Sequence, residues 1–157
     1  MVFRIPIFLA LLTLGGLCRP ANAQEAAKEW PALPQAVSSL GAVECDGYVY
    51  IYGGHAGKTH TYSTRDVLGS FHRLKLDGGA KWEELLGGPI LQGMNLAAHG
   101  GKVYRVGGMR PRNDATQPTD NVSVADAARF DPKSQQVGVA PAPARGPVVP
   151  RPRGRRR

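Results

Sequence analysis

The chain has little cysteine and no apolar run that is long enough to cross a membrane as a helix. Its 157 residues include two cysteines, Cys18 and Cys45. Cys18 lies in a segment that we expect to be removed, so no internal disulfide is predicted and packing must stabilise the fold. The apolar run over residues 5–17 falls short of the roughly 20 residues that a transmembrane helix requires. The sequence therefore predicts no transmembrane segment.

This short apolar run has the features of an export signal. Arg4 precedes it, and Ala21-Asn22-Ala23 follows it with the small residues that a signal peptidase accepts. An uncleaved anchor and a buried first helix are the alternatives, but the short run and the cleavage pattern argue against both. We predict a signal peptide over residues 1–23, cleavage near Ala23, and a mature chain that is periplasmic or secreted.

The body of the protein lacks a net charge, although the whole chain carries a formal charge of +8. Between residues 24 and 140, twelve Lys and Arg balance twelve Asp and Glu. Nucleic-acid binding by the folded part is therefore not expected. Residues 139–157 have no aromatic and no acidic residue, and they are predicted to form a disordered basic Pro/Arg tail. This tail is a solvated end, a basic arm for an anionic surface, or a terminus foreign to the fold.

An internal repeat with an offset of 54 residues is present between Leu40 and Asp131. The segment 47–54 superposes on 101–108, with five of the eight residues identical. The same offset, without a gap, pairs Leu76-Asp77 with Phe130-Asp131. Such a period indicates a repeat architecture. We predict a first unit at residues 40–93 and an incomplete second unit at 94–138, preceded by a leader at 24–39.

Each unit is predicted to be an antiparallel meander of β-strands, which makes the fold class all-β. The first unit has a strong hairpin signal at Asp46-Gly47, and its glycine pair Gly53-Gly54 is expected to end the second strand. The strands expected in this unit cover residues 40–45, 48–52, 71–76 and 81–85. In the second unit only three strands are expected, over residues 94–99, 102–106 and 122–130.

These units resemble the kelch repeat, whose copies form the blades of a β-propeller. The resemblance rests on a glycine pair after an apolar strand, an apolar residue before an aspartate, and a later tryptophan. The residues that carry it are Gly53, Gly54, Asp77, Trp82, Gly107, Gly108 and Asp131. Residues 29–34 resemble the outer strand of a preceding blade. A closed propeller of such units needs more than roughly 300 residues, so we expect an incomplete propeller of about two blades and a truncated or frame-altered relative of a longer protein.

The stretch YIYGGHAGKTHTY, residues 50–62, contains a Gly-Lys-Thr sequence that is typical of phosphate-binding loops. Such a loop needs a glycine five residues before Gly57, and that position is Tyr52. The residues that follow have no helical periodicity, and the second unit keeps the glycines but loses the lysine. No nucleotide is expected. The glycines are predicted to serve the backbone, through positive φ and the close approach of neighbouring strands.

The two long loops are predicted to lie on one face, where propellers usually bind their ligands. They cover residues 54–67 and 108–122. The candidate binding residues on this face are His55, Lys58, His60, Arg110, Arg112, Asn113 and Asp114. Each of them is also compatible with the ordinary polarity of a solvated loop.

No group of residues in the sequence indicates catalysis, a metal or another cofactor. The four histidines show no metal-ligand spacing, and no carboxylate pair or Ser/His/Asp set stands out. Kelch relatives include copper oxidases of sugars and isomerases of sialic acid. The resemblance implies that such sites draw on blades absent here.

The sequence therefore predicts a binding module for a protein or a carbohydrate. An inactive fragment of a sugar-processing propeller enzyme, similar to sialic acid epimerases or galactose oxidase, is the main alternative, and an inert remnant is another. Repeat units that lack neighbours expose their faces, so self-association or a partner on an exposed face is also expected.

Overall fold

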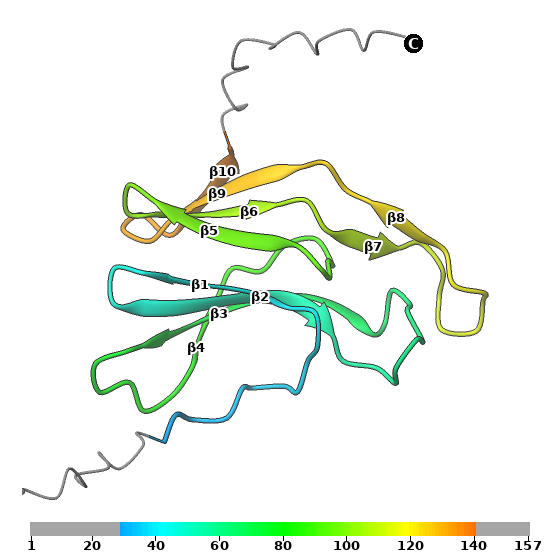
Figure 1. The fold of residues 1–157 in the computed structure, drawn as a ribbon, viewed down its shortest axis with the longest axis horizontal. Coiled ribbons are helices and arrows are strands. Elements are labelled where there is room, and N and C mark those ends of the chain that lie inside the picture. The colour runs from blue at the N-terminus through cyan, green and yellow to red at the C-terminus, as the bar shows by residue number, and fades with distance from the viewer. Residues whose placement is uncertain (1–28, 141–157) are drawn as a thin grey trace, which may run out of the picture.

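Two four-stranded antiparallel sheets, stacked face to face, form most of the structure (Figure 1). The computed structural model describes residues 29–140. The predicted signal peptide and nearly all of the predicted tail lie outside these residues. The first sheet consists of β1 (Gly41–Cys45), β2 (Tyr48–His55), β3 (Val67–Lys75) and β4 (Glu83–Leu85), in that order. The second has the order β10-β9-β6-β5. Its strands are β5 (Asn95–His99), β6 (Lys102–Val106), β9 (Ala127–Asp131) and β10 (Gln136–Val139).

A short hairpin extends the second unit towards the long loops. It consists of β7 (Met109–Pro111) and β8 (Asn121–Ser123), which form a separate two-stranded sheet. No helix occurs between residues 29 and 140, so the all-β, antiparallel class is confirmed for this part of the chain. The same range contains no helix long and apolar enough to span a membrane.

Tight turns join the strands at one end of both sheets, and the long loops lie at the opposite end (Figure 1). The predicted hairpin turn is present: Asp46 and Gly47 have φ values of 50° and 77°, as the common two-residue hairpin turns require. Gly100 and Gly101 form the equivalent turn, with φ values of 56° and 67°. The turns and the long loops therefore lie at opposite ends of the sheets, as the sequence predicted.

The glycine pair of the first unit does not end its strand, contrary to the prediction. β2 continues to His55, and its register with β3 shifts between Tyr52 and Gly54. Gly53 has a φ of 60°, and a side chain there would collide with the carbonyl oxygen of Leu91. The glycine is thus needed for the positive φ and for the close approach of the segment that leads to the second sheet.

The core lies between the two sheets and is built from aromatic residues. Phe71 of β3 and Phe130 of β9 meet edge to face, with ring centroids 4.9 Å apart. Tyr50 of β2 is fully buried and lies 6.0 Å from Phe130. Cys45 at the end of β1 belongs to the same cluster with 4% of its surface exposed. Burial raises the pKa of its thiol, with smaller contributions from Asp46 and Glu44.

The leader covers the outer face of the first sheet without forming a strand. Pro34 and Val37 line a small hollow together with Ile51, and the carbonyl oxygen of Pro31 accepts a hydrogen bond of 3.1 Å from Trp82 Nε1. The outer strand predicted at residues 29–34 is therefore wrong. Prolines remove backbone donors from this segment, and no further sheet lies beside it within the described residues.

The predicted offset of 54 residues holds for the first two strands of each unit and then changes. Val49 pairs with Leu74 in the first sheet, and Val103 pairs with Phe130 in the second. Leu74 and Phe130 are therefore equivalent, so the ungapped alignment is displaced by two residues beyond the long loops. A shift of two keeps every residue on the same face, which explains why the sequence pattern still appeared regular.

The second unit also differs from its predicted strand count. The strand expected over residues 122–130 is divided between β8 and β9, which belong to different sheets. A fourth strand, β10, pairs with β9 although only three strands were expected. All four of its residues are exposed, so the sequence had no clear apolar pattern that would predict this strand.

Candidate functional site

A buried asparagine joins the long loops of the two units. Asn113 has 5% of its surface exposed, and its Nδ2 donates a hydrogen bond of 2.8 Å to the carbonyl oxygen of Tyr62. Its backbone oxygen accepts from the amide of Thr64 at 3.0 Å, and its Oδ1 accepts from the amide of Asp120 at 2.9 Å. One side-chain bond and one backbone bond of Asn113 therefore join the two loops, at a residue that is shielded from water.

The loop of the first unit is held by contacts within itself. His55 is 5% exposed, and its ring lies 4.9 Å from that of Tyr62. The Nε2 of His55 is 3.0 Å from the carbonyl oxygen of Thr61, which accepts the proton in the tautomer protonated at Nε2. Ser63 Oγ donates to Asp66 Oδ2 at 2.8 Å. These contacts set the Tyr62 ring in place before any ligand arrives.

The loop of the second unit is ordered by two aspartates. Asp114 Oδ1 accepts from both the amide and the hydroxyl of Thr116, at 2.9 and 2.7 Å. Asp120 accepts two hydrogen bonds from Arg112, at 2.8 and 2.9 Å. Both side chains of this ion pair are largely exposed, so the pair orients the loop more than it stabilises the fold.

The carboxylates of both loops have lowered pKa values. The hydrogen bond from Ser63, with help from Arg65, lowers the pKa of Asp66. The bonds from Thr116 lower the pKa of Asp114, and Arg112 lowers that of Asp120. All three groups are therefore ionised at neutral pH.

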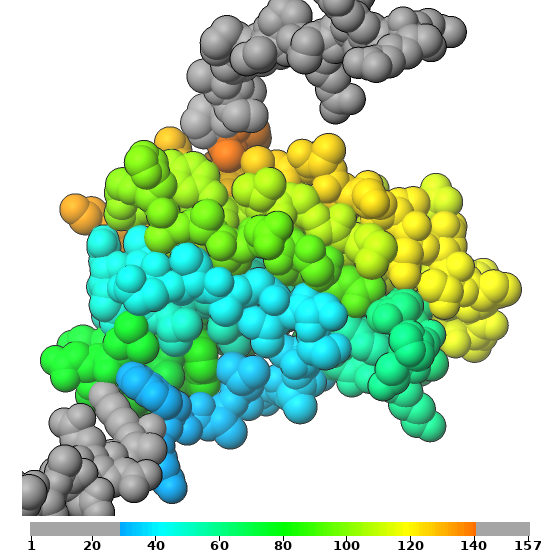
Figure 2. Space-filling model, viewed as in Figure 1, coloured from blue at the N-terminus to red at the C-terminus, as the bar shows by residue number. Residues whose placement is uncertain are grey.

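A polar cleft of about 210 Å³ lies between the two loops, and we call it the loop cleft. Figure 2 shows the loops, green in the first unit and yellow in the second, at the same end of the molecule. The first loop contributes an aromatic ring, hydroxyls and a carboxylate, and the second contributes amides and hydroxyls. The main lining residues are His60, Tyr62, Ser63, Asp66, Asn113, Gln117 and Thr119. Such groups can exchange several hydrogen bonds with a polar ligand and cover one apolar face of it.

The structure distributes the seven candidate binding residues over different environments. His60 and Asn113 line the loop cleft, and Lys58 lines a more open hollow beside it with Arg65 and Asp66. His55 is buried beneath Tyr62. Arg112 and Asp114 are bound within the second loop. Arg110 is exposed on β7.

Sequence reasoning did not select the residues that define the cleft most clearly. Tyr62, Gln117 and Thr119 line it but were not among the candidates. A tyrosine in a polar loop, two residues after a histidine, was a usable signal, because an aromatic ring without a core to enter is often a binding residue. Gln117 and Thr119 carried no such signal. Between residues 29 and 140, no three His, Cys, Asp or Glu residues come together as metal ligands would.

Comparisons with known proteins support the fold and nothing finer. No family model matches the sequence, and no curated protein matches it either. Among 98 matching chains of solved structures, that of YjhT is similar with a TM-score of 0.54 and 19% sequence identity. The match covers 70% of this chain and 29% of the YjhT chain. The likeness at this identity concerns the arrangement of strands alone.

Proposed function

We propose that the chain is an exported module of kelch-type β-propeller blades that binds a glycan or a glycan-bearing protein in the loop cleft. The observation that carries the proposal is the buried Asn113, which joins the loops of two successive units into one preformed polar cleft. A cleft that is ordered in advance lowers the entropy cost of binding. The role proposed is recognition, without chemistry performed by the chain.

The sheets support the kelch interpretation through their arrangement. Each is a meander of four antiparallel strands. A glycine pair lies at the loop end of β2 in the first sheet, and another directly follows β6 in the second. The two sheets stack in the same orientation, so that Tyr50 of the first faces Phe130 of the second. Radial repetition of such sheets builds a propeller.

The dimensions and chemistry of the loop cleft favour a sugar over a long peptide. Its volume of about 210 Å³ is below the roughly 300–1,000 Å³ of typical drug-sized sites. One sugar ring presents hydroxyls to bond with carboxylate and amide groups, and a flatter face to stack on an aromatic ring. Asp66, Gln117 and Tyr62 provide these three kinds of group.

A glycan array followed by calorimetry with the hit glycan tests the proposal. We expect binding that Tyr62→Ala and Gln117→Ala each weaken at least about tenfold. The matched control is Arg110→Ala, an exposed residue of β7 outside the cleft lining, which should keep full affinity. An array without a hit, or equal loss in the control, would contradict the proposal.

The same sample distinguishes binding from the enzymatic alternative. Nuclear magnetic resonance of the bound sugar over hours should show it unchanged. Conversion of the sugar would favour a sugar-processing enzyme instead. Export is proposed from the sequence alone, and a mature N-terminus at Gln24 in protein isolated from the periplasm or the medium is the expected finding.

A further inference from the structure

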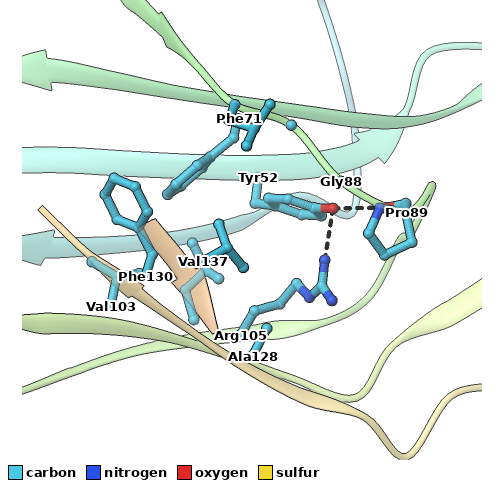
Figure 3. A pocket seen from close by; sticks show the side chains of 12 residues that line it. Tyr52, Phe71, Gly88, Pro89, Val103, Arg105, Ala128, Phe130 and Val137 are labelled. Atoms are coloured by element: carbon cyan, nitrogen blue, oxygen red, sulfur yellow. Dashed lines mark hydrogen bonds between the residues drawn. The ribbon is translucent and has the colours of Figure 1, made fainter. Parts of the chain in front are cut away.

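A small cavity lies between the two sheets and shares no lining residue with the loop cleft. It has a volume of about 70 Å³ and is enclosed mainly by apolar side chains (Figure 3). Those that matter here are Phe71 of the first sheet and Val103, Phe130 and Val137 of the second. The cavity thus belongs to the interface between the units.

One cationic side chain, that of Arg105, lines this otherwise apolar cavity. Arg105 of β6 lines it, and its Nη1 donates a hydrogen bond of 2.7 Å to the hydroxyl of Tyr52. That hydroxyl in turn donates to the carbonyl oxygen of Pro89 at 2.7 Å (Figure 3). The guanidinium carbon also lies 4.8 Å from the centroid of the Tyr52 ring. The arginine is therefore held in one orientation by neutral groups.

The positive charge of Arg105 has no anionic partner within the described residues. Its Nε is buried and makes no hydrogen bond, and the ion pairs formed between residues 29 and 140 do not include it. Asp126 borders a neighbouring surface hollow with Arg105 but forms no ion pair with it. A buried donor left unpaired is unfavourable, and more so when it is charged, so an anion placed there would be favoured.

Two differences between the units create this arrangement. Arg105 stands where the first unit has Ile51, which introduces the charge. In the second unit, Phe130 pairs with Val137. In the first unit, Arg73 pairs with Glu83, and the same register places Trp82 opposite Leu74, the equivalent of Phe130. Val137 therefore stands where the first unit has Trp82. Valine is much smaller than tryptophan, which leaves space between the sheets.

The cavity has an entrance at the edge of the sheets. Two residues that line the cavity are exposed: Val137 to 51% and Leu86 to 74%. Arg105 also borders the surface hollow next to β10. A small ligand can therefore enter without separating the sheets.

We propose that this cavity binds a short-chain organic carboxylate, with its carboxylate on Arg105 and its apolar tail between Phe71, Phe130 and Val137. Arginine binds carboxylates through paired N–H donors. An apolar cavity of about 150 Å³ holds benzene, so one of half that volume suits a tail of about three carbons. Butyrate is the corresponding probe.

Thermal unfolding and calorimetry of the full chain with sodium butyrate test this site. Butyrate should raise the melting temperature saturably. Sodium formate supplies the charge without the tail, and 1-butanol supplies the tail without the charge. Both should give less than about a tenth of the affinity. A response to butyrate no larger than that to sodium chloride at the same ionic strength would overturn the proposal and leave a cavity that holds water only.

Two substitutions separate the charge from the space. Arg105→Met removes the charge at similar length, and Val137→Trp fills the cavity. Each should lower butyrate affinity at least tenfold, and Val137→Trp should raise the melting temperature of the unliganded chain. If either variant fails to fold, Arg105→Lys and Val137→Leu replace them, with a smaller loss expected. Unchanged affinity in the variants would place butyrate elsewhere and contradict the assignment.

The loop cleft provides the matched control. Tyr62→Ala should leave butyrate binding unchanged, because Tyr62 does not line the cavity. Loss of butyrate binding in that variant would indicate that the carboxylate occupies the loop cleft instead. The cavity and the proposed glycan site are therefore tested independently.

Discussion

Among residues 29–140, the first sheet is covered on both faces, whereas the second is covered on one. The leader lies over Ile51 on the outer side of the first sheet, and this residue is 8% exposed. On the outer side of the second sheet, Val106 is 47% exposed. The first sheet therefore packs against the leader and the second sheet, whereas the second sheet packs against the first sheet alone within the described residues.

The two faces of each unit are therefore not equivalent: one faces the neighbouring sheet and the other faces away from it. Tyr50 of the first unit faces the second sheet, and its equivalent Tyr104 points away from the first sheet, because Val103 beside it is in the core. The outer face of the second sheet is thus the surface onto which a third sheet would stack. Self-association through this face remains a prediction, and the mass of the chain in solution checks it.

The largest expected effect contrasts the shared core with this outer face. Phe130→Ala removes a ring that contacts Tyr50 and Phe71, and we expect a loss of about 3–5 kcal/mol in the free energy of unfolding. Tyr104→Ala on the outer face should cost less than about 1.5 kcal/mol, since that side chain packs against a single sheet. Chemical denaturation measures both. Equal losses would mean that the outer face is covered in solution.

The glycine pairs provide the second contrast. Gly53 combines a φ of 60° with a collision against Leu91 if a side chain is added, so Gly53→Ala should cost about 3 kcal/mol. Gly107 has a similar φ of 65°, but the nearest atom to an added Cβ is 3.4 Å away. Gly107→Ala should cost only the backbone strain, about 1–2 kcal/mol. A reversed order in thermal unfolding would refute the close approach at Gly53.

Neighbouring residues of the second loop provide a third contrast. Asn113→Ala leaves the Tyr62 carbonyl and the Asp120 amide without their partner, and it should cost about 2 kcal/mol. Arg112→Ala removes an exposed ion pair and should cost less than about 1 kcal/mol. Denaturation curves give both values. If Asn113→Ala were neutral, the loops would not depend on this side chain.

The smallest expected effect is a loosening of the loops in acid. The folded pKa values of Asp66, Asp114 and Asp120 lie below their ordinary values, so ionisation stabilises the loops above the ordinary pKa of about 3.9. This stabilisation is lost as the pH falls through the lowered folded values. Hydrogen-exchange protection of the Thr64 and Thr116 amides should therefore decrease from pH 5 to pH 3, while the amides of β6 stay protected. Uniform loss of protection would indicate global unfolding instead.

Local patterns in the sequence were sufficient for the strands and turns of the sheets. β6 was predicted with its observed bounds of 102 and 106, because apolar alternation between two glycine turns allows few other structures. The hairpin of β7 and β8 was missed because it depends on tertiary contacts, such as the bridge between Gln92 and Met109. β10 was missed because its residues are exposed and carry little pattern.

The candidate site was less predictable, since it depends on which loop residues turn inward. His55 looked like a ligand contact in the sequence, but it is buried and holds the first loop. Asn113 does line the cleft, but it is buried and also holds the two loops together. Residues that contact a ligand and residues that hold a loop are of the same polar types, and only the three-dimensional contacts distinguish them. Arg105 did carry a signal, because it places a cation where the repeat has Ile51.

Cys45 provides a built-in reporter of the interface between the units. Its thiol is 4% exposed within the shared core, and its raised pKa disfavours the reactive thiolate. In a chain with Cys18→Ser, an alkylating reagent can reach Cys45 only when the two sheets part. The labelling rate therefore measures how often the units separate, and a molecule that clamps them together should slow that rate at concentrations where it is bound.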